Sequence, residues 1–138
     1  MNHVWTVICS RAVIDRDSNN VSLQNILEVL SIKEAPKPQG VLPIELDVVT
    51  LWIRESILEP EIGYSRTRFL SPSGKTLGEF ESKVDLTEHE RSRAKLILQG
   101  LPLREEGLYT FRVDMKKTEE GRWRKVAEIP LKVDFTQE

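Results

Sequence analysis

Alternating apolar and polar side chains mark residues 103–115 as an extended strand. In an extended chain, successive side chains point to opposite faces, so residues of one parity share a face. One face carries the apolar residues Tyr109, Phe111, Val113 and Met115. The other face carries the polar residues Thr110, Arg112 and Asp114. This pattern predicts a strand with one face in a hydrophobic core.

Two further stretches, residues 3–10 and 45–54, are apolar on both parities and rich in β-branched residues. Such segments are typical of central strands that are buried on both faces. Trp52 is the bulky core candidate of the second stretch. Because a strand of a two-layer sandwich has one face toward water, the second apolar face needs cover from a loop, a helix or a partner.

A β-hairpin is predicted around residues 71–74, which read Ser-Pro-Ser-Gly between strands at 63–70 and 75–84. Pro72 presets the backbone φ angle for a turn, and Gly74 supplies a positive φ at its end.

Residues 21–32 fit two patterns. Leu23, Ile26, Leu27 and Leu30 have helical spacing, whereas the β-branched residues and the prolines that follow favour a strand. We expect a strand here. The proline-containing connection at 36–43 is then expected to carry the chain from one sheet to the other.

The last strand is predicted over residues 123–135, after a turn at 117–121. Trp123 shares its parity with the apolar residues of this strand and is expected in the core. Pro130 lies on the opposite parity, and because proline cannot donate a ladder hydrogen bond it indicates an edge or a bulge.

Short strands separated by turn signals recur along the whole chain, without a long amphipathic helix. A polar turn is predicted at 15–20, and a loop or a short helical turn at 88–93 precedes a strand at 94–98. This spacing predicts an all-β fold, an antiparallel two-layer β-sandwich of about seven to nine strands. The length suits one domain over residues 1–138.

Composition excludes several classes of protein. The chain has 138 residues, one cysteine and a formal net charge of −2, with its charges spread along the sequence. Cys9 cannot form an internal disulfide, and no apolar run is long enough to span a membrane. We therefore expect a soluble, cytoplasmic protein without a dedicated nucleic-acid or membrane surface.

Glu106, Gly107 and Tyr109 resemble the tyrosine corner of immunoglobulin-like sandwiches, in which a tyrosine hydroxyl bonds to backbone upstream. Together with the hairpin at 68–77 and the Gly-x-Tyr-x-Phe strand at 107–113, the chain is similar to a family of uncharacterised bacterial proteins of comparable length. The resemblance implies an immunoglobulin-like sandwich and no known activity.

The sequence offers weak candidates for chemistry. His3, His89 and Cys9 are too few and too dispersed for a zinc site, and no Gly-x-Ser-x-Gly elbow supports a catalytic His89. Residues 71–76 end in Gly-Lys-Thr but lack the first glycine of a phosphate loop, and residues 15–20 lack the pattern of a calcium loop. We expect no catalytic residue, metal or cofactor.

Opposite charges face each other across the predicted hairpin. Arg66 and Arg68 alternate on one strand, and Glu79, Glu81 and Lys83 alternate on the next. Cross-strand pairs of this kind stabilise a sheet by about 0.2 to 1 kcal/mol each, so a solvated sheet face explains them.

The best candidate for an interaction patch combines basic residues with an aromatic ring. Its members are Arg112, Lys116, Arg122, Trp123 and Arg124. Such a patch can hold an acidic partner or a single-stranded nucleic acid through charge and stacking. The same turn contains Glu119 and Glu120, and these two acidic residues argue against nucleic-acid binding.

Two hypotheses for function follow. The first is a non-catalytic protein-interaction module whose partner is another protein or a second copy of the chain. The alternative is a small-ligand-binding or hydrolytic domain with a loop-built site at His89, Asp85, Glu88 and Arg91.

Overall fold

Every regular element in the described part of the chain is a β-strand. The computed structural model describes residues 1–33 and 44–136, and none of them forms a helix long and apolar enough to cross a membrane. The strands are β1 Asn2–Ile14, β2 Val21–Ile26, β3 Val29–Ile32, β4 Leu46–Ile53, β5 Glu61–Leu70, β6 Thr76–Leu86, β7 Arg91–Leu98, β8 Gly107–Lys116 and β9 Arg124–Phe135.

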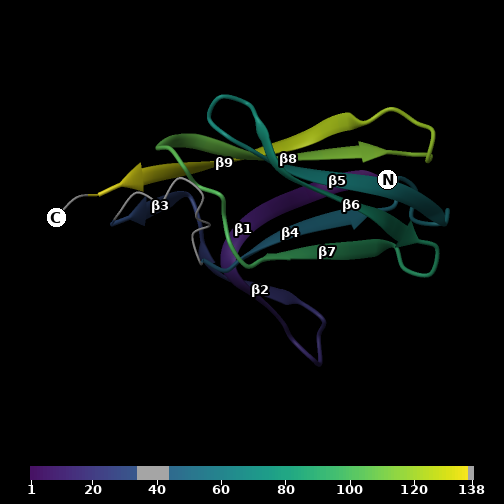
Figure 1. The fold of residues 1–138 in the computed structure, drawn as a ribbon. Coiled ribbons are helices and arrows are strands. Elements are labelled where there is room, and N and C mark those ends of the chain that lie inside the picture. Colours follow the sequence, from purple (N-terminus) through teal and green to yellow (C-terminus); the bar gives the residue numbers. More distant parts are fainter. Residues whose placement is uncertain (34–43, 137–138) are drawn as a thin grey trace.

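The strands form two sheets that pack face to face (Figure 1). Sheet A has the order β2-β1-β4-β7, and sheet B has the order β3-β9-β8-β5-β6. The predicted all-β sandwich is therefore confirmed. One pair departs from the expected antiparallel arrangement, because β3 runs parallel to β9.

The strand predicted over 103–115 starts later in the structure: β8 begins at Gly107 and lies inside sheet B between β9 and β5. Its apolar parity is buried as expected, with Phe111 and Val113 fully enclosed. The ring of Phe111 packs on Phe69 with centroids 4.7 Å apart. The Tyr109 hydroxyl donates a hydrogen bond of 2.7 Å to the carbonyl oxygen of Glu105. The upstream bond expected of this tyrosine is thus confirmed.

Residues 21–32 are extended, but they form two strands rather than one. Asn25 adopts a positive φ of 54°, which breaks the strand before Leu27. The chain then passes from sheet A, where β2 pairs with β1, to sheet B, where β3 pairs with β9. The expected sheet-to-sheet connection at 36–43 lies outside the described residues, although β3 and β4 do belong to different sheets.

The second apolar face of sheet A is covered by the chain itself. Beyond Cys9, β1 leaves β4 and forms with β2 a hairpin that projects from the sheet in Figure 1. The hairpin packs over Val49, and Cys9, Ala12 and Val49 are buried together. The Ala12 amide donates a hydrogen bond of 2.8 Å to Asp47, which fixes the hairpin to β4.

The hairpin tip is also bound to sheet A. Residues 15–20 form the predicted turn, in which Asp15 accepts hydrogen bonds from the amide and the hydroxyl of Ser18. Arg93 of β7 donates a hydrogen bond of 2.7 Å to the carbonyl oxygen of Asn19. The hairpin is therefore the loop that the two-sided apolar pattern required.

The prediction that Trp123 lies in the core is wrong. Between β8 and β9 the register shifts, so that Val113 faces Ala127 while Asp114 faces Lys125. This extra residue in β9 is a β-bulge, and it moves the side chains that precede it to the opposite face of the sheet. Trp123 consequently lies on the outer face of sheet B.

The remaining local predictions hold, except that residues 91–93 belong to a strand. Residues 71–74 form the β5–β6 turn, and Gly74 has a φ of 90°. Strand β7 begins at Arg91, within the segment where a loop or a helical turn was expected. At Pro130, β9 is bounded by β8 on one side only, because β3 pairs with β9 from Lys132 onward.

Two substitutions in β8 test this core. We expect Tyr109→Phe to lower the free energy of unfolding by about 1 kcal/mol through one lost hydrogen bond. Phe111→Ala should lower it by about 3 to 5 kcal/mol, because it leaves a cavity beside Phe69. Urea titrations measure both effects, and equal, negligible losses would show that β8 is not central to the core.

Candidate functional site

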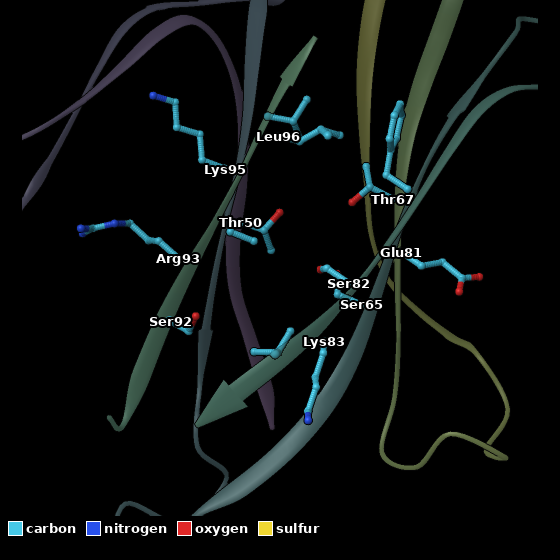
Figure 2. Close-up of a pocket in the computed structure, with 14 residues that line it drawn as sticks. Thr50, Ser65, Thr67, Glu81, Ser82, Lys83, Ser92, Arg93, Lys95 and Leu96 are labelled. Carbon is cyan, nitrogen blue, oxygen red and sulfur yellow. The ribbon is translucent and has the colours of Figure 1, made fainter. Parts of the chain in front are cut away.

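A cleft opens between the sheets at one long side of the sandwich. There the edge strand of sheet B, β6, lies opposite the edge strand of sheet A, β7. The cleft has a volume of about 450 Å³ and is lined by residues of β4, β5, β6 and β7 (Figure 2). This concave surface between the two sheets is the candidate site.

Hydroxyl groups dominate the polar lining of the cleft. Thr50 comes from sheet A, Ser65 and Thr67 come from β5, and Ser82 and Ser92 come from the two edge strands. The strand pairing aligns them, because Ser65 lies opposite Ser82 within sheet B. Thr50 and Ser65 are almost completely buried, at 3% and 5% exposure. The hydroxyls therefore reach from the rim into the interior.

On the sheet A side the hydroxyls are linked by hydrogen bonds. The Thr50 hydroxyl lies 3.0 Å from that of Thr6, which in turn lies 2.7 Å from Nε2 of His3. Burial lowers the pKa of His3, so this ring is neutral near pH 7. The chain from His3 to Thr50 orients one hydroxyl of the cleft without adding charge.

The remaining hydroxyls of the cleft come from β5 and β6 of sheet B and from β7 of sheet A. Within residues 1–33 and 44–136, the side chains of Ser65, Thr67, Ser82 and Ser92 accept and donate no hydrogen bond. Ser82 is exposed, and Thr67 and Ser92 are half-buried, so their hydroxyls can hydrogen-bond to water or to a ligand in the cleft.

The hydroxyls also divide the hydrophobic core. One buried cluster lies around Phe69 and Phe111, and a second lies around Trp52 and Met115. Thr6, Thr50 and Ser65 are buried at the level between them. A polar row in the middle of a core contradicts its apolar pattern, and such conflicts concentrate at functional sites.

The inward parity of the lining is uncharged, whereas four charged residues, Glu81, Lys83, Arg93 and Lys95, line the cleft from the outward parity. Val48, Val84 and Leu96 add apolar surface to its walls, and Phe80 is partly exposed at the rim. Figure 2 shows Arg93 and Lys95 directed away from the space between the sheets. The arrangement can therefore bind neutral, hydrogen-bonding groups.

The residues of the loop-built site expected at His89 lie outside the cleft. Asp85 accepts hydrogen bonds of 2.6 and 2.9 Å from the hydroxyl and the amide of Thr87, and these bonds lower the pKa of Asp85. His89 and Glu88 are exposed and belong to no part of the cleft lining. Arg91 is exposed at the start of β7.

The predicted interaction patch is divided between two surroundings. The Trp123 ring lies against two cations, with Arg66 4.7 Å and Lys116 4.5 Å from its centroid. Arg124 contacts the sulfur of Met115 at 3.6 Å, whereas Arg122 is exposed.

Asp114 organises the basic residues beneath Trp123. This fully buried carboxylate accepts hydrogen bonds from Arg66 at 2.8 Å, from Arg68 at 3.1 Å and from Arg112 at 3.1 Å. Of the expected hairpin pairs, Arg66 contacts Glu79 at 3.7 Å. The arginines thus serve chiefly to neutralise Asp114, which the sequence had indicated only as a polar outward position.

Burial alone would raise the pKa of Asp114, but the hydrogen bonds and positive charges of Arg66 and Arg112 outweigh it and hold the pKa below its usual value. In the described part of the chain, no group of His, Cys, Asp and Glu side chains could hold a metal ion.

Comparison with known proteins gives no assignment. No family model matches the chain, and a search of curated proteins finds no relative. The resemblance to a family of bacterial sandwiches stays a prediction, and function has to be argued from the site.

Two substitutions test whether the cleft hydroxyls differ in their partners. We expect Ser65→Ala to leave the free energy of unfolding unchanged or to raise it by up to about 1 kcal/mol, because the lost hydroxyl has no partner. Thr50→Val should lower the free energy of unfolding by about 1 kcal/mol, because the hydrogen bond between Thr50 and Thr6 is lost. Thermal melts of both variants decide the matter, and a Ser65→Ala loss as large as that of Thr50→Val would contradict it.

Asp114→Asn should lower the free energy of unfolding by about 3 kcal/mol at pH 7, because partly buried arginines lose their counter-charge. The native pKa of Asp114 lies below the unfolded value of about 3.9, so this contribution is complete above that pH and is lost as the pH falls through the native pKa. Denaturant titrations should therefore show the wild-type and variant stabilities converging below about pH 4. A constant difference down to pH 2 would show that Asp114 is not the titrating group.

Proposed function

We propose that the protein is a non-catalytic binding module that takes an extended polypeptide segment at the open side of the sandwich. The observation that carries this proposal is the hydroxyl-lined cleft between two unpaired edge strands. Neutral hydroxyls supply hydrogen bonds rather than acid–base chemistry, which supports binding over catalysis.

The edges of β6 and β7 can accept a further strand. In the described residues, β6 pairs with β5 alone and β7 pairs with β4 alone. Each therefore has a row of backbone amides and carbonyls free to pair with an added strand. Strand addition to an exposed sheet edge is a recurrent mode of peptide recognition, in which backbone bonds give affinity and side-chain pockets give specificity.

The cleft lining determines which side chains of such a segment would fit into the cleft. Ser82, Ser92 and Ala94 are small, and the space of about 450 Å³ that they leave suits residues of medium size. The free hydroxyls of Ser65 and Thr67 favour side chains that both donate and accept, such as asparagine, glutamine, serine and threonine.

The outward side of β7 determines which residues would suit the alternate positions of the bound segment, which point away from the cleft. Arg91, Arg93 and Lys95 alternate on this edge strand. A segment added to β7 would bring every second side chain beside them, and acidic residues there form favourable cross-strand pairs. The expected segment therefore alternates acidic residues with hydrogen-bonding residues.

A cytoplasmic location belongs to this proposal, supported by the single thiol of Cys9 being fully buried. The alternative, a small-ligand-binding or hydrolytic site at His89, is not favoured, because its residues lie outside the cleft and Asp85 already accepts hydrogen bonds from Thr87.

The test is a selection from a library of extended peptides, followed by calorimetry with the peptides recovered. We expect binding to be lost in Ser65→Val and in Ser82→Val, which fill the cleft with methyl groups, and kept in Ser22→Val. Ser22 is an exposed hydroxyl of β2 that lies outside the cleft, so it is a matched control.

Chemical-shift changes on peptide addition should concentrate in β7 and in the cleft residues. Recovery of no peptide, or binding that survives both valine substitutions in the cleft, would overturn the proposal.

A further inference from the structure

We propose that two copies of this chain associate through the β4–β5 loop, each loop inserting an apolar tip into a basic depression of the other copy. The apolar tip consists of Ile57 and Leu58. The basic depression is the hollow beside the β8–β9 turn, lined by Met115, Lys116, Lys117, Thr118, Gly121, Arg122 and Arg124. This surface is separate from the cleft between β6 and β7.

The apolar tip is exposed to an unusual degree. Leu58 is 90% exposed and Ile57 is 66% exposed, although both are large aliphatic residues. Single exposed apolar residues are common, but two adjacent ones at the end of a loop present a continuous apolar knob.

The loop that carries the tip is held in place by Arg54. Its guanidinium donates hydrogen bonds to three carbonyl oxygens, those of Leu86 at 2.7 Å, Ile57 at 2.7 Å and Thr87 at 3.0 Å. Within the loop, the Glu59 amide donates to the carbonyl oxygen of Ser56 at 3.1 Å. A loop fixed in this way loses little conformational entropy when it docks, which favours association.

The basic depression matches the tip in size and in character. Its volume is about 240 Å³, enough for an aliphatic side chain. Met115 and Gly121 contribute apolar surface, as do the aliphatic stems of the surrounding lysine and arginine side chains. The turn around it is ordered by hydrogen bonds from Lys116 to Glu119 and from Gly121 to Thr118.

The charges around the two surfaces are complementary. Glu55 and Glu59 flank the tip, and Lys117, Arg122 and Arg124 surround the depression. Glu119 and Glu120 lie in the same turn, and Glu55 contacts Lys117 of its own chain at 3.7 Å, so Glu59 with Arg122 and Arg124 carries the match. Charges placed in this way steer association and fix its register.

A hollow of matching size argues for a second copy over a membrane. Anionic headgroups would be repelled by Glu55 and Glu59 but attracted by Lys117, Arg122 and Arg124 at the same end, so vesicle binding is an outcome of the test.

Both surfaces lie at the same end of the sandwich, so a two-fold axis can bring them together. Lys117 of the β8–β9 turn lies 3.7 Å from Glu55 of the β4–β5 loop in the same chain. A self-complementary patch of adjacent knob and hollow is what an isologous dimer requires. The two contacts of such a dimer are identical and close the assembly.

Sedimentation velocity over a concentration series up to about 0.5 mM tests this proposal, because interfaces at the small end of the size range associate weakly. We expect a monomer–dimer equilibrium. Leu58→Ser should raise the dimer dissociation constant by roughly tenfold or more, since the buried apolar surface is lost. Leu108→Ser is the matched control, because Leu108 is 55% exposed at the opposite end of β8, and it should leave the constant unchanged.

Charge reversal distinguishes this interface from a general apolar contact. Glu59→Arg and Arg122→Glu should each weaken the dimer, and a mixture of the two single variants should form heterodimers more readily than either variant forms homodimers. Ser65→Val, which fills the cleft, should leave dimerisation intact, so that failure of the peptide proposal is distinguishable from failure of this one.

A strict monomer over the whole concentration series would overturn the proposal. So would a dimer that is insensitive to Leu58→Ser, or co-sedimentation of the monomer with vesicles of phosphatidylcholine and phosphatidylserine that depends on Leu58.

Discussion

The constraint that shapes this molecule is a row of hydroxyl groups across the middle of its core. Thr6 and Thr50 in sheet A face Ser65 in sheet B, at the level between two apolar clusters. Apolar side chains hold the sheets together on either side of this row, whereas the row itself leads to the open side between β6 and β7. The cleft exists because small polar residues occupy positions that large apolar residues would otherwise close.

The opposite side of sheet A shows how the same chain deals with excess apolar surface. Strand β1 continues past the sheet and returns with β2 as a hairpin over Val49. Hydrogen bonds from Arg93 and to Asp47 fix that hairpin. The two-sided apolar pattern of β4 is satisfied within one chain, so it does not argue for a partner. The argument for partners comes instead from the cleft and from the exposed tip at Leu58.

Local patterns predicted the strands because they depend on neighbours in sequence. The alternation in β8 and the turn at Gly74 are of this kind. Features that depend on pairing between distant strands were missed. The bulge in β9 inverts the face of Trp123, and Asn25 divides one predicted strand between two sheets.

The sequence did not predict the candidate site, because the site also depends on pairing and packing between distant strands. Ser65, Ser82 and Thr50 are far apart in the chain, and each is unremarkable in its own strand. Only the pairing of β5 with β6 and the packing of sheet A on sheet B bring them together. One signal was present: Thr50 interrupts the apolar residues of β4 on its inward parity, between Val48 and Trp52.

The most direct test of this account is amide hydrogen exchange, measured residue by residue by NMR on the free protein at a concentration where it is monomeric. Alternate amides of an edge strand point toward its single neighbour or away from it. The account predicts that β7 amides directed toward β4 are protected and that those directed away exchange rapidly, with the same alternation in β6. Uniform protection along both strands would show that the open side is closed, and would contradict the cleft.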